Sequence, residues 1–442
     1  MFRHCPFQLR TAFFLTRHFP QEDTPLDDHW RHYLDQSRER IVSLQRELVA
    51  RPALGPDNQG QGEADKARFL VDELGRIGFD TVRELRSDDD RVSCGYRPNL
   101  VAVLPGEDTG RTLWFISHTD IVPAGDRDLW SGDPFQLRVE DDYLYGRGVE
   151  DNHHGLTASL LAVESLLATG TTPRINAGLL MVADEETGSR HGLEFLLKQH
   201  EDLFGPDDLF LVPDFGSPDS SLVEVAEKGM LWVKFTVHGR QCHASTPEKG
   251  LNSLLVASDL ILRLRSLHER FDLENELFQP PFSTFEATRK EANVPNINTI
   301  PGKDVFYLDC RVLPAYEPEA VLEEIKNLAD LTAKDHNTSI DCEVVHQEFA
   351  PATPEDSPVV QALSRAVQRE TGVRARPKGI GGGTVAALIR RRGYPAAVWS
   401  TILNNAHQPD EHTRISHIIR DATVFASMLL DPDLGGRDAT HG

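Results

Sequence analysis

The chain has 442 residues, which is enough for about two to four domains of ordinary size. Apolar residues make up 39% of it and 32 glycines add to that share, so the composition is globular and excludes global disorder. The net charge of −23 argues against nucleic acid or a membrane surface as a partner, because both need clustered Lys and Arg.

The five cysteines have no C-x-x-C spacing. They therefore support neither a disulfide framework nor a thiolate zinc site, and a reducing cytoplasm is the expected location. Residues 1–26 mix basic residues with scattered Phe and Leu and lack the unbroken apolar core of a signal sequence. We predict that they form an unordered extension. The apolar stretches are all shorter than the ~20 residues that a membrane helix needs.

The first folded region alternates helices with short apolar strands. Periodicity predicts helices over Asp27–Val49, Glu63–Ile77 and Asp151–Ala168, and strands over Asn99–Gly106, Arg111–Asp120 and Ile175–Ala183. This alternation is typical of an α/β domain with a mainly parallel sheet flanked by helices.

The pattern changes near Ser221 and changes back near residue 350. Between them we predict a strand, then a helix at Ser253–Leu267, a strand at Asp304–Pro314, a helix at Glu317–Thr332 and a strand at Ser339–Phe349. The order β-α-β-α-β indicates a ferredoxin-like α+β domain. Helices at Pro358–Thr371 and Ile415–Leu430 and a strand at 395–400 then resume the α/β pattern. The sequence thus predicts a discontinuous domain, 27–222 and 350–432, into which 223–349 is inserted.

Polar residues gather where the predicted strands end. His118 and Asp120 follow one strand, at the edge where α/β proteins bind ligands. His118 offers a metal one ring nitrogen while Asp120 fixes the other. A purely structural role for this pair remains an open alternative.

Acidic residues follow two further elements. Asp151 begins a predicted helix, where it acts either as a helix cap or as a ligand. Glu185 and Glu186 follow a buried strand, where they form either a solvated turn or a pair in which one binds metal and the other accepts a proton.

Asp214 follows another apolar run, and His407 lies near the C-terminus. Either one alone is compatible with an ordinary loop. Together with the acids above they make a set of imidazole and carboxylate ligands without thiolate, which suits two divalent ions: zinc first, with cobalt or manganese as alternatives.

The motifs SHTDIVP, GRGVEDN, ADEETGS, PDFG and NNAHQPDEH occur in this order. With them the chain resembles the ArgE/DapE/aminoacylase/carboxypeptidase G metallopeptidase family from about residue 38 to 430. The resemblance implies a catalytic domain with two metal ions, an inserted lid that also dimerises, and a cis peptide between Asp151 and Asn152.

The resemblance also implies a role for each motif residue. His118 and Asp214 would hold one metal, Glu186 and His407 the other, and Asp151 would bridge both. Glu185 becomes the general base, which deprotonates a water between the metals so that it attacks an amide carbonyl, and Asp120 orients His118.

Other motifs of the family concern the substrate. HGRQCHASTPEKGLNS implies that His243 reaches a partner subunit's active site and stabilises the oxyanion. NVPNINTIPG and LDCRVLP supply Asn298 and Arg311 for a substrate carboxylate. GIGGGTVAAL brings Gly383 and Thr384 to the same end of the substrate. Many relatives have an acid where this chain has Val385, which puts polar specificity there in doubt.

Two histidines depart from the family pattern. His153 and His154 follow the bridging acid, where small or polar residues are common. We expect them to face solvent from the predicted helix.

The sequence therefore predicts a dinuclear amidohydrolase that cleaves an N-acyl amino acid or a short peptide and works as a homodimer through its lid. The alternative is a catalytically inactive binding protein on the same scaffold. A zinc-stabilised structural protein is disfavoured, because structural zinc sites are normally rich in Cys.

Overall fold

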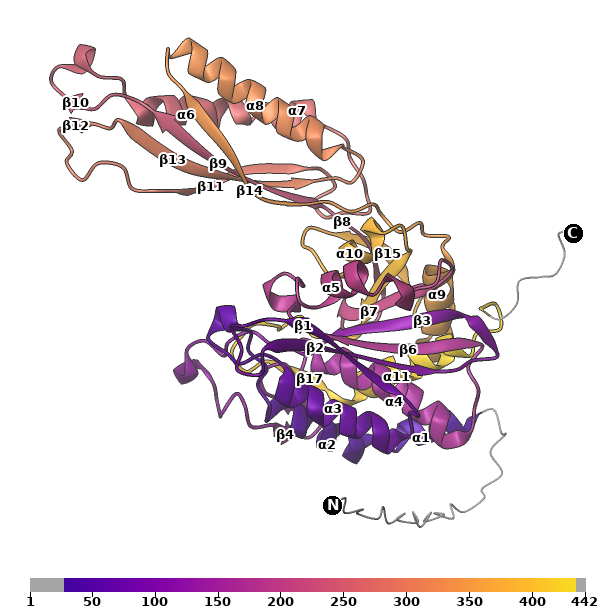
Figure 1. The fold of residues 1–442 in the computed structure, drawn as a ribbon. Coiled ribbons are helices and arrows are strands. Elements are labelled where there is room, and N and C mark those ends of the chain that lie inside the picture. Colours follow the sequence, from indigo (N-terminus) through magenta and orange to yellow (C-terminus); the bar gives the residue numbers. More distant parts are fainter. Residues whose placement is uncertain (1–27, 435–442) are drawn as a thin grey trace, which may run out of the picture.

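The computed structural model describes residues 28–434. The extension predicted at 1–26 lies outside them. Two bodies are visible in Figure 1: a large sheet wrapped in helices, and an elongated smaller sheet that projects from it. None of the helices in the described range is both long and apolar enough for a membrane span.

The larger body is built on an eight-stranded sheet with the order β1-β2-β6-β3-β7-β16-β8-β15. Its centre is parallel, because β3 pairs in parallel with β6 and β7, and β7 with β16. Antiparallel strands lie mainly at the β1 edge. The strands are β1 (Val82–Asp88), β2 (Tyr96–Leu104), β3 (Asp108–His118), β6 (Ile175–Val182), β7 (Leu209–Gly216), β8 (Leu222–Glu227), β15 (Arg376–Ile380) and β16 (Ala396–Ser400).

Helices cover both faces of this sheet, which confirms the predicted α/β class. One face packs on α1 (His29–Asp35), α2 (Arg38–Val49), α3 (Ala64–Ile77), α4 (His153–Thr169), α9 (Pro358–Thr371) and α11 (Ile415–Leu429). The other packs on α5 (Leu193–Gln199) and α10 (Ala386–Arg391). The single helix predicted over Asp27–Val49 is wrong: α1 ends at Asp35, and a turn separates it from α2.

The site lies where the parallel strands end. β3 ends at His118, which pairs with Val182 at the end of β6, two residues before Asp184. Asp214 lies near the end of the neighbouring β7. Because the carboxyl ends of parallel strands meet at one edge of the sheet, residues far apart in sequence converge there. A small sheet of β4 (Arg138–Glu140), β5 (Tyr143–Tyr145) and β17 (His412–Arg414) completes this body.

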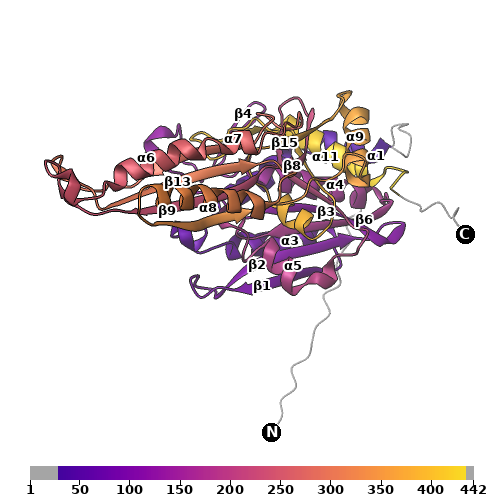
Figure 2. The same cartoon turned by 90° about the horizontal axis from the view of Figure 1, so that it is seen from above.

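The smaller body has four antiparallel strands in the order β11-β13-β9-β14. They are β9 (Gly229–His238), β11 (Thr284–Lys290), β13 (Lys303–Val312) and β14 (Ile340–Glu348), packed against α6 (Ser253–Leu264), α7 (Leu267–Arg270) and α8 (Pro318–Asp335). Figure 2 shows these helices lying along the sheet. At the far tip, β10 (Cys242–His243) pairs with β12 (Thr299–Ile300).

One strand of the four-stranded sheet was not predicted. β11 reads Thr-Phe-Glu-Ala-Thr-Arg-Lys and is exposed beyond its first two residues. An edge strand with so little apolar surface carries almost no alternation signal. The chain passes from the large sheet to the small one between Glu227 and Gly229.

Candidate metal centre

The five predicted ligands lie together at the carboxyl edge of the large sheet. Asp151 lies between two imidazoles: its Oδ1 is 2.9 Å from Nε2 of His118, and its Oδ2 is 3.0 Å from Nε2 of His407. Nε2 of His118 is also 3.7 Å from Oδ1 of Asp214. Nε2 of His407 is 3.3 Å from Oε2 of Glu186. The cluster therefore consists of two groups that share Asp151.

The charges of the cluster fit divalent cations. Hydrogen bonds to Asp151 and Glu186 raise the pKa of His407 to about 10. Burial alone would lower the pKa of His118, but the carboxylates around it raise the value well above normal. Conversely, the two imidazoles hold the pKa of Asp151 below its usual value despite burial.

Glu186 contains the clearest sign of an additional partner. Its Oε1 is buried and has no hydrogen-bond partner within residues 28–434. A buried carboxylate oxygen normally has a donor or a cation. His118, Asp151 and Glu186 bring ligand atoms within 4.8 Å of one another. Imidazole and carboxylate donors in this arrangement suit zinc, cobalt or manganese.

Glu185 lies beside the ligands without joining the group. It lines a cavity together with four of the predicted ligands. Burial raises the pKa of Glu185 well above its usual value, and the nearby carboxylates of Asp214 and Glu186 raise it further. A carboxylate with a raised pKa next to a metal cluster is suited to accepting and returning a proton.

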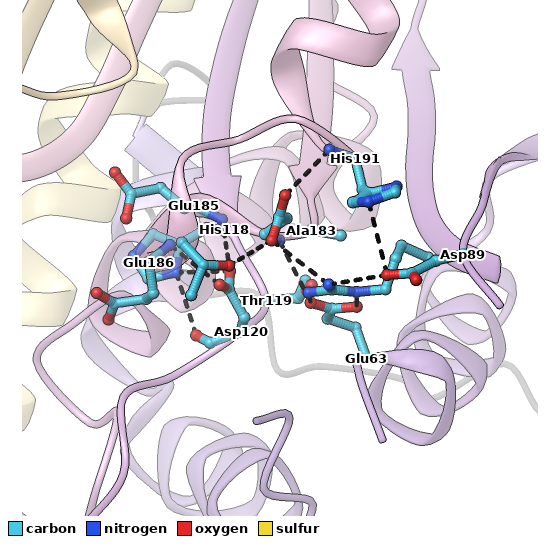
Figure 3. A network of polar contacts seen from close by, with 12 residues as sticks. Glu63, Asp89, His118, Thr119, Asp120, Ala183, Glu185, Glu186 and His191 are labelled. Atoms are coloured by element: carbon cyan, nitrogen blue, oxygen red, sulfur yellow. Dashed lines mark hydrogen bonds and ion pairs between the residues drawn. The ribbon is translucent and has the colours of Figure 1, made fainter. Parts of the chain in front are cut away.

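Asp120 connects His118 to the turn that carries the two glutamates (Figure 3). Its carboxylate accepts hydrogen bonds from the backbone N–H groups of Glu185 and Glu186, each at 3.1 Å. Nδ1 of His118 is 3.1 Å from the carbonyl oxygen of Asp120 and 3.4 Å from Oδ1 of Asp120. Asp120 thus sets the position of the turn as well as the orientation of the imidazole.

A buried ion network that the sequence analysis missed supports the same turn from behind. Arg97 is fully buried and pairs with Glu63, and its Nη1 lies 3.4 Å from Oδ1 of Asp184. Asp184 in turn accepts a hydrogen bond from the N–H of His191 at 3.0 Å. Arg97 lies inside a strand pattern, and nothing in the local sequence distinguishes it from an exposed arginine.

The sequence analysis also missed two carboxylates, Glu150 and Glu411. Glu150 is next to Asp151 but binds the loop of His407, and Glu411 is near His407 in sequence but binds the loop of Asp151. Glu150, next to Asp151, accepts hydrogen bonds from the N–H groups of Leu403 at 2.7 Å and Asn405 at 2.6 Å, in the loop that leads to His407. Glu150 and Glu411, whose contacts are the mirror case, form a pair that we call the reciprocal clasp, because each binds the loop of the other.

Glu411 follows His407 and binds the loop of Asp151. It accepts hydrogen bonds from the N–H groups of Gly148 at 3.0 Å, Glu150 at 2.9 Å and Asp151 at 3.1 Å, and pairs with Arg147. Both carboxylates of the clasp are at most 3% exposed. Each loop is therefore held by an acid from the other, so the distance between Asp151 and His407 is fixed.

The start of α4 brings two ligands together. The peptide between Asp151 and Asn152 is cis, as predicted. Nδ2 of Asn152 donates to Asp214 and, at 2.8 Å, to the carbonyl of Pro213. A Cβ at Gly155 would lie 2.1 Å from that carbonyl oxygen, so only glycine permits this close approach of helix and strand.

The prediction that His153 and His154 face solvent is wrong. Both are 0% exposed. His153 lies 2.7 Å from Nζ of Lys66, and His154 lies 2.8 Å from Asp421. The helix α4 is buried on all sides beneath the sheet, and a polar residue on such a helix must find partners inside the protein.

A cavity of about 660 Å³ opens beside the ligands. Gly383 and Thr384, which the family resemblance assigns to the substrate, line it. Arg311 reaches from the smaller body and donates to the carbonyl of Gly381 at 2.9 Å. His243 and Asn298 are exposed and do not line the cavity. His243 lies at the tip of the smaller body, where its Nδ1 is 2.7 Å from Ser245 Oγ.

A mainly parallel sheet with imidazoles and carboxylates at its carboxyl edge defines a metallohydrolase of the α/β class. Comparison with known proteins identifies the family: residues 114–431 match the model of peptidase family M20/M25/M40, and the chain belongs to it. It is therefore a hydrolase of a metal-dependent peptidase family.

Two relatives and one solved structure illustrate this membership. An uncharacterised metallohydrolase of Methanococcus maripaludis is 37% identical over 415 residues, covering 88% of this chain and 99% of the relative. A succinyl-diaminopimelate desuccinylase of Gluconacetobacter diazotrophicus is 28% identical, covering 88% and 96%. The structure of aminopeptidase PepT from Bacillus cereus matches with a TM-score of 0.72 at 20% identity, covering 89% and 98%, which supports the fold of a catalytic domain with a lid.

Proposed function

We propose that the protein is a dinuclear amidohydrolase that releases an amino acid from an N-acyl amino acid or a short peptide. The observation that carries this proposal is Asp151, whose two oxygens each face one imidazole at about 3 Å. His118 and Asp214 would hold one cation, and His407 and Glu186 the other. Divalent cations, when bound, supply Lewis acidity that lowers the pKa of water and polarises a carbonyl.

The residues of the chain have separate tasks in this reaction. Glu185, which lies in the cavity without a metal-binding role, accepts a proton from the attacking water and returns it to the leaving nitrogen. Asp120 holds the turn of Glu185 through two backbone hydrogen bonds, so the base stays next to the ligands. The loop Gly381–Thr384, together with Arg311, would receive the carboxylate end of the substrate. Asn298 lies beside His243 at the tip of the lid, so it would reach the substrate only in a partner subunit.

The proposal extends to the assembly and the location of the enzyme. We place it in the cytoplasm as a homodimer joined through the smaller body. This body starts after Glu227, because β8 belongs to the large sheet, and not at the predicted residue 223; the large body is the catalytic domain. His243 is far along the lid and exposed. In a dimer it would therefore serve the partner subunit's active site, where an imidazole stabilises an oxyanion.

Metal content and activity measured together test the function. The purified protein is analysed by mass spectrometry for zinc, cobalt and manganese, and amide hydrolysis is followed before and after chelation and metal add-back. The substrates are N-succinyl and N-acetyl amino acids and dipeptides. We expect about two metals per chain and activity that chelation removes and metal restores. Metal-loaded protein that cleaves none of these amides would contradict the proposal and favour a binding protein.

A further inference from the structure

Glu227 is a buried acid at the point where the chain leaves the large sheet for the lid. It is 4% exposed. Its Oε1 accepts two hydrogen bonds from Thr384, one from the backbone N–H at 3.0 Å and one from the hydroxyl at 2.6 Å. The same oxygen lies 3.6 Å from Nη1 of Arg390.

The loop that Glu227 holds is part of the wall of the metal-site cavity. Gly381–Thr384 line this cavity together with Glu185 and Glu186. Oε2 of Glu227 is 3.6 Å from the point that a Cβ on Gly383 would occupy, so the acid lies directly behind the loop. The N–H groups of Gly382 and Gly383 donate no hydrogen bond within the described part of the chain. Free backbone N–H groups next to one another favour an anion.

We propose that Glu227 is a positioning residue of the active site, which shapes the loop Gly381–Thr384 to receive the anionic end of the substrate. The inference rests on the proposed function. Arg311 holds the start of the loop through the Gly381 carbonyl, and Glu227 holds its end through Thr384. Three consecutive glycines have little preference of their own for one conformation, so these two anchors determine the shape of the loop.

The charge of Glu227 matters as well as its hydrogen bonds. Burial, and then the nearby Glu224, raise the pKa of Glu227 to about 8, although Arg390 opposes the shift. Arg390 is itself committed to Glu224 at 2.8 Å, and Glu348 at the end of β14 pairs with Arg391 at 3.0 Å. At neutral pH Glu227 therefore carries its proton and adds no negative charge of its own behind the loop. Above about pH 8 it ionises and opposes an anion at the loop.

Three variants separate the hydrogen bonds from the charge. Glu227→Ala removes both; Glu227→Gln keeps a neutral acceptor for Thr384; Glu348→Gln is the matched control, because Oε2 of Glu348 is 3.7 Å from the same Gly383 point but makes no hydrogen bond to the loop. Hydrogen–deuterium exchange of the peptide 379–388 and the steady-state constants of the zinc-loaded enzyme on N-succinyl and N-acetyl amino acids are measured from pH 7 to 9.

We expect Glu227→Ala to speed amide exchange in the loop and to raise KM about tenfold, the effect of two lost hydrogen bonds, with much less change in kcat. Wild-type KM rises above about pH 8. In Glu227→Gln, KM stays flat and the exchange resembles that of the wild type. Glu348→Gln keeps the wild-type loop exchange and the wild-type dependence of KM on pH.

Two results would overturn the proposal: unchanged loop exchange in Glu227→Ala, or a rise of KM with pH in Glu227→Gln equal to that of the wild type. If wild-type protein cleaves no substrate, the proposed function fails, but the exchange experiment still decides whether Glu227 holds the loop. Should the alanine variant fail to fold, the pH profile of the glutamine variant gives the decision.

Discussion

The carboxyl edge of the large sheet and the lid use carboxylates in opposite ways. Glu411 at the sheet edge is 1% exposed and bonds to three backbone N–H groups. Glu343 on the lid strand β14 pairs with Lys234, and the side chain of Glu343 is 67% exposed. Backbone donors in a buried site fix an acid in place, whereas an exposed ion pair contributes little. Buried acids of the large body therefore hold the candidate metal ligands in place, whereas this lid carboxylate contributes little.

The largest effect should come from the sheet edge. Glu185→Gln removes the proton acceptor but none of the predicted ligands, so we expect kcat to fall about 10³-fold while metal content stays unchanged. Steady-state kinetics and mass spectrometry of the same preparation check this. Glu186→Gln is the matched neighbour, and it should lose metal. A fully active Glu185→Gln enzyme would show that another group is the base.

The second-largest effect is expected from breaking the reciprocal clasp. Glu411→Gln leaves the buried Arg147 without its carboxylate partner. It also places the N–H₂ group of the new amide against backbone N–H groups, so that donors face donors. The free energy of unfolding in urea should fall by about 3–5 kcal/mol. The adjacent Asp410→Asn, whose carboxylate bonds to Ser131 near the surface, should change it by less than about 1 kcal/mol. Equal losses of stability in Glu411→Gln and Asp410→Asn would show that the buried clasp contributes no more than a surface carboxylate.

The smallest of the three concerns the lid. His243→Ala should lower kcat about 10²-fold in the dimer, as for the loss of one oxyanion donor, and leave the metals in place. His238→Ala serves as control, since that lid histidine pairs with Asp341 on the exposed face. Mixing His243→Ala with Glu185→Gln should restore activity, because one mixed dimer contains one intact site. An unchanged rate in His243→Ala would contradict the role across subunits.

The sequence was sufficient to bring the residues at strand ends together. His118, Glu186 and Asp214 follow predicted strands, and the carboxyl edge of a parallel sheet gathers such residues. Asp151 at a helix start and His407 in a loop joined the predicted set through the family resemblance. Supporting residues gave no such signal. Arg97, Glu150 and Glu411 act through contacts across the fold, and local sequence does not distinguish a buried charge from an exposed one.

Two of the errors, on His153 and His154 and on β11, have related causes. His153 and His154 were assigned to solvent because they are polar, although α4 is enclosed on every side by the sheet and its neighbours. β11 was missed for the opposite reason, because an exposed edge strand lacks apolar alternation. In both cases the burial of the element is set by its neighbours in the tertiary structure, and the local sequence does not show it.

The clasp also orders events during synthesis. Its two acids and the ligands beside them come from opposite ends of the chain, with the entire lid between them. The segment with Asp151 leaves the ribosome long before the segment with His407, so the first half of the protein cannot close its own ligand set. Binding of a metal at the proposed site has to wait until the loop with His407 and Glu411 has been added. A chain that ends between residues 350 and 406 would keep its lid sequence and four of the five proposed ligands, and still be unable to complete the metal site.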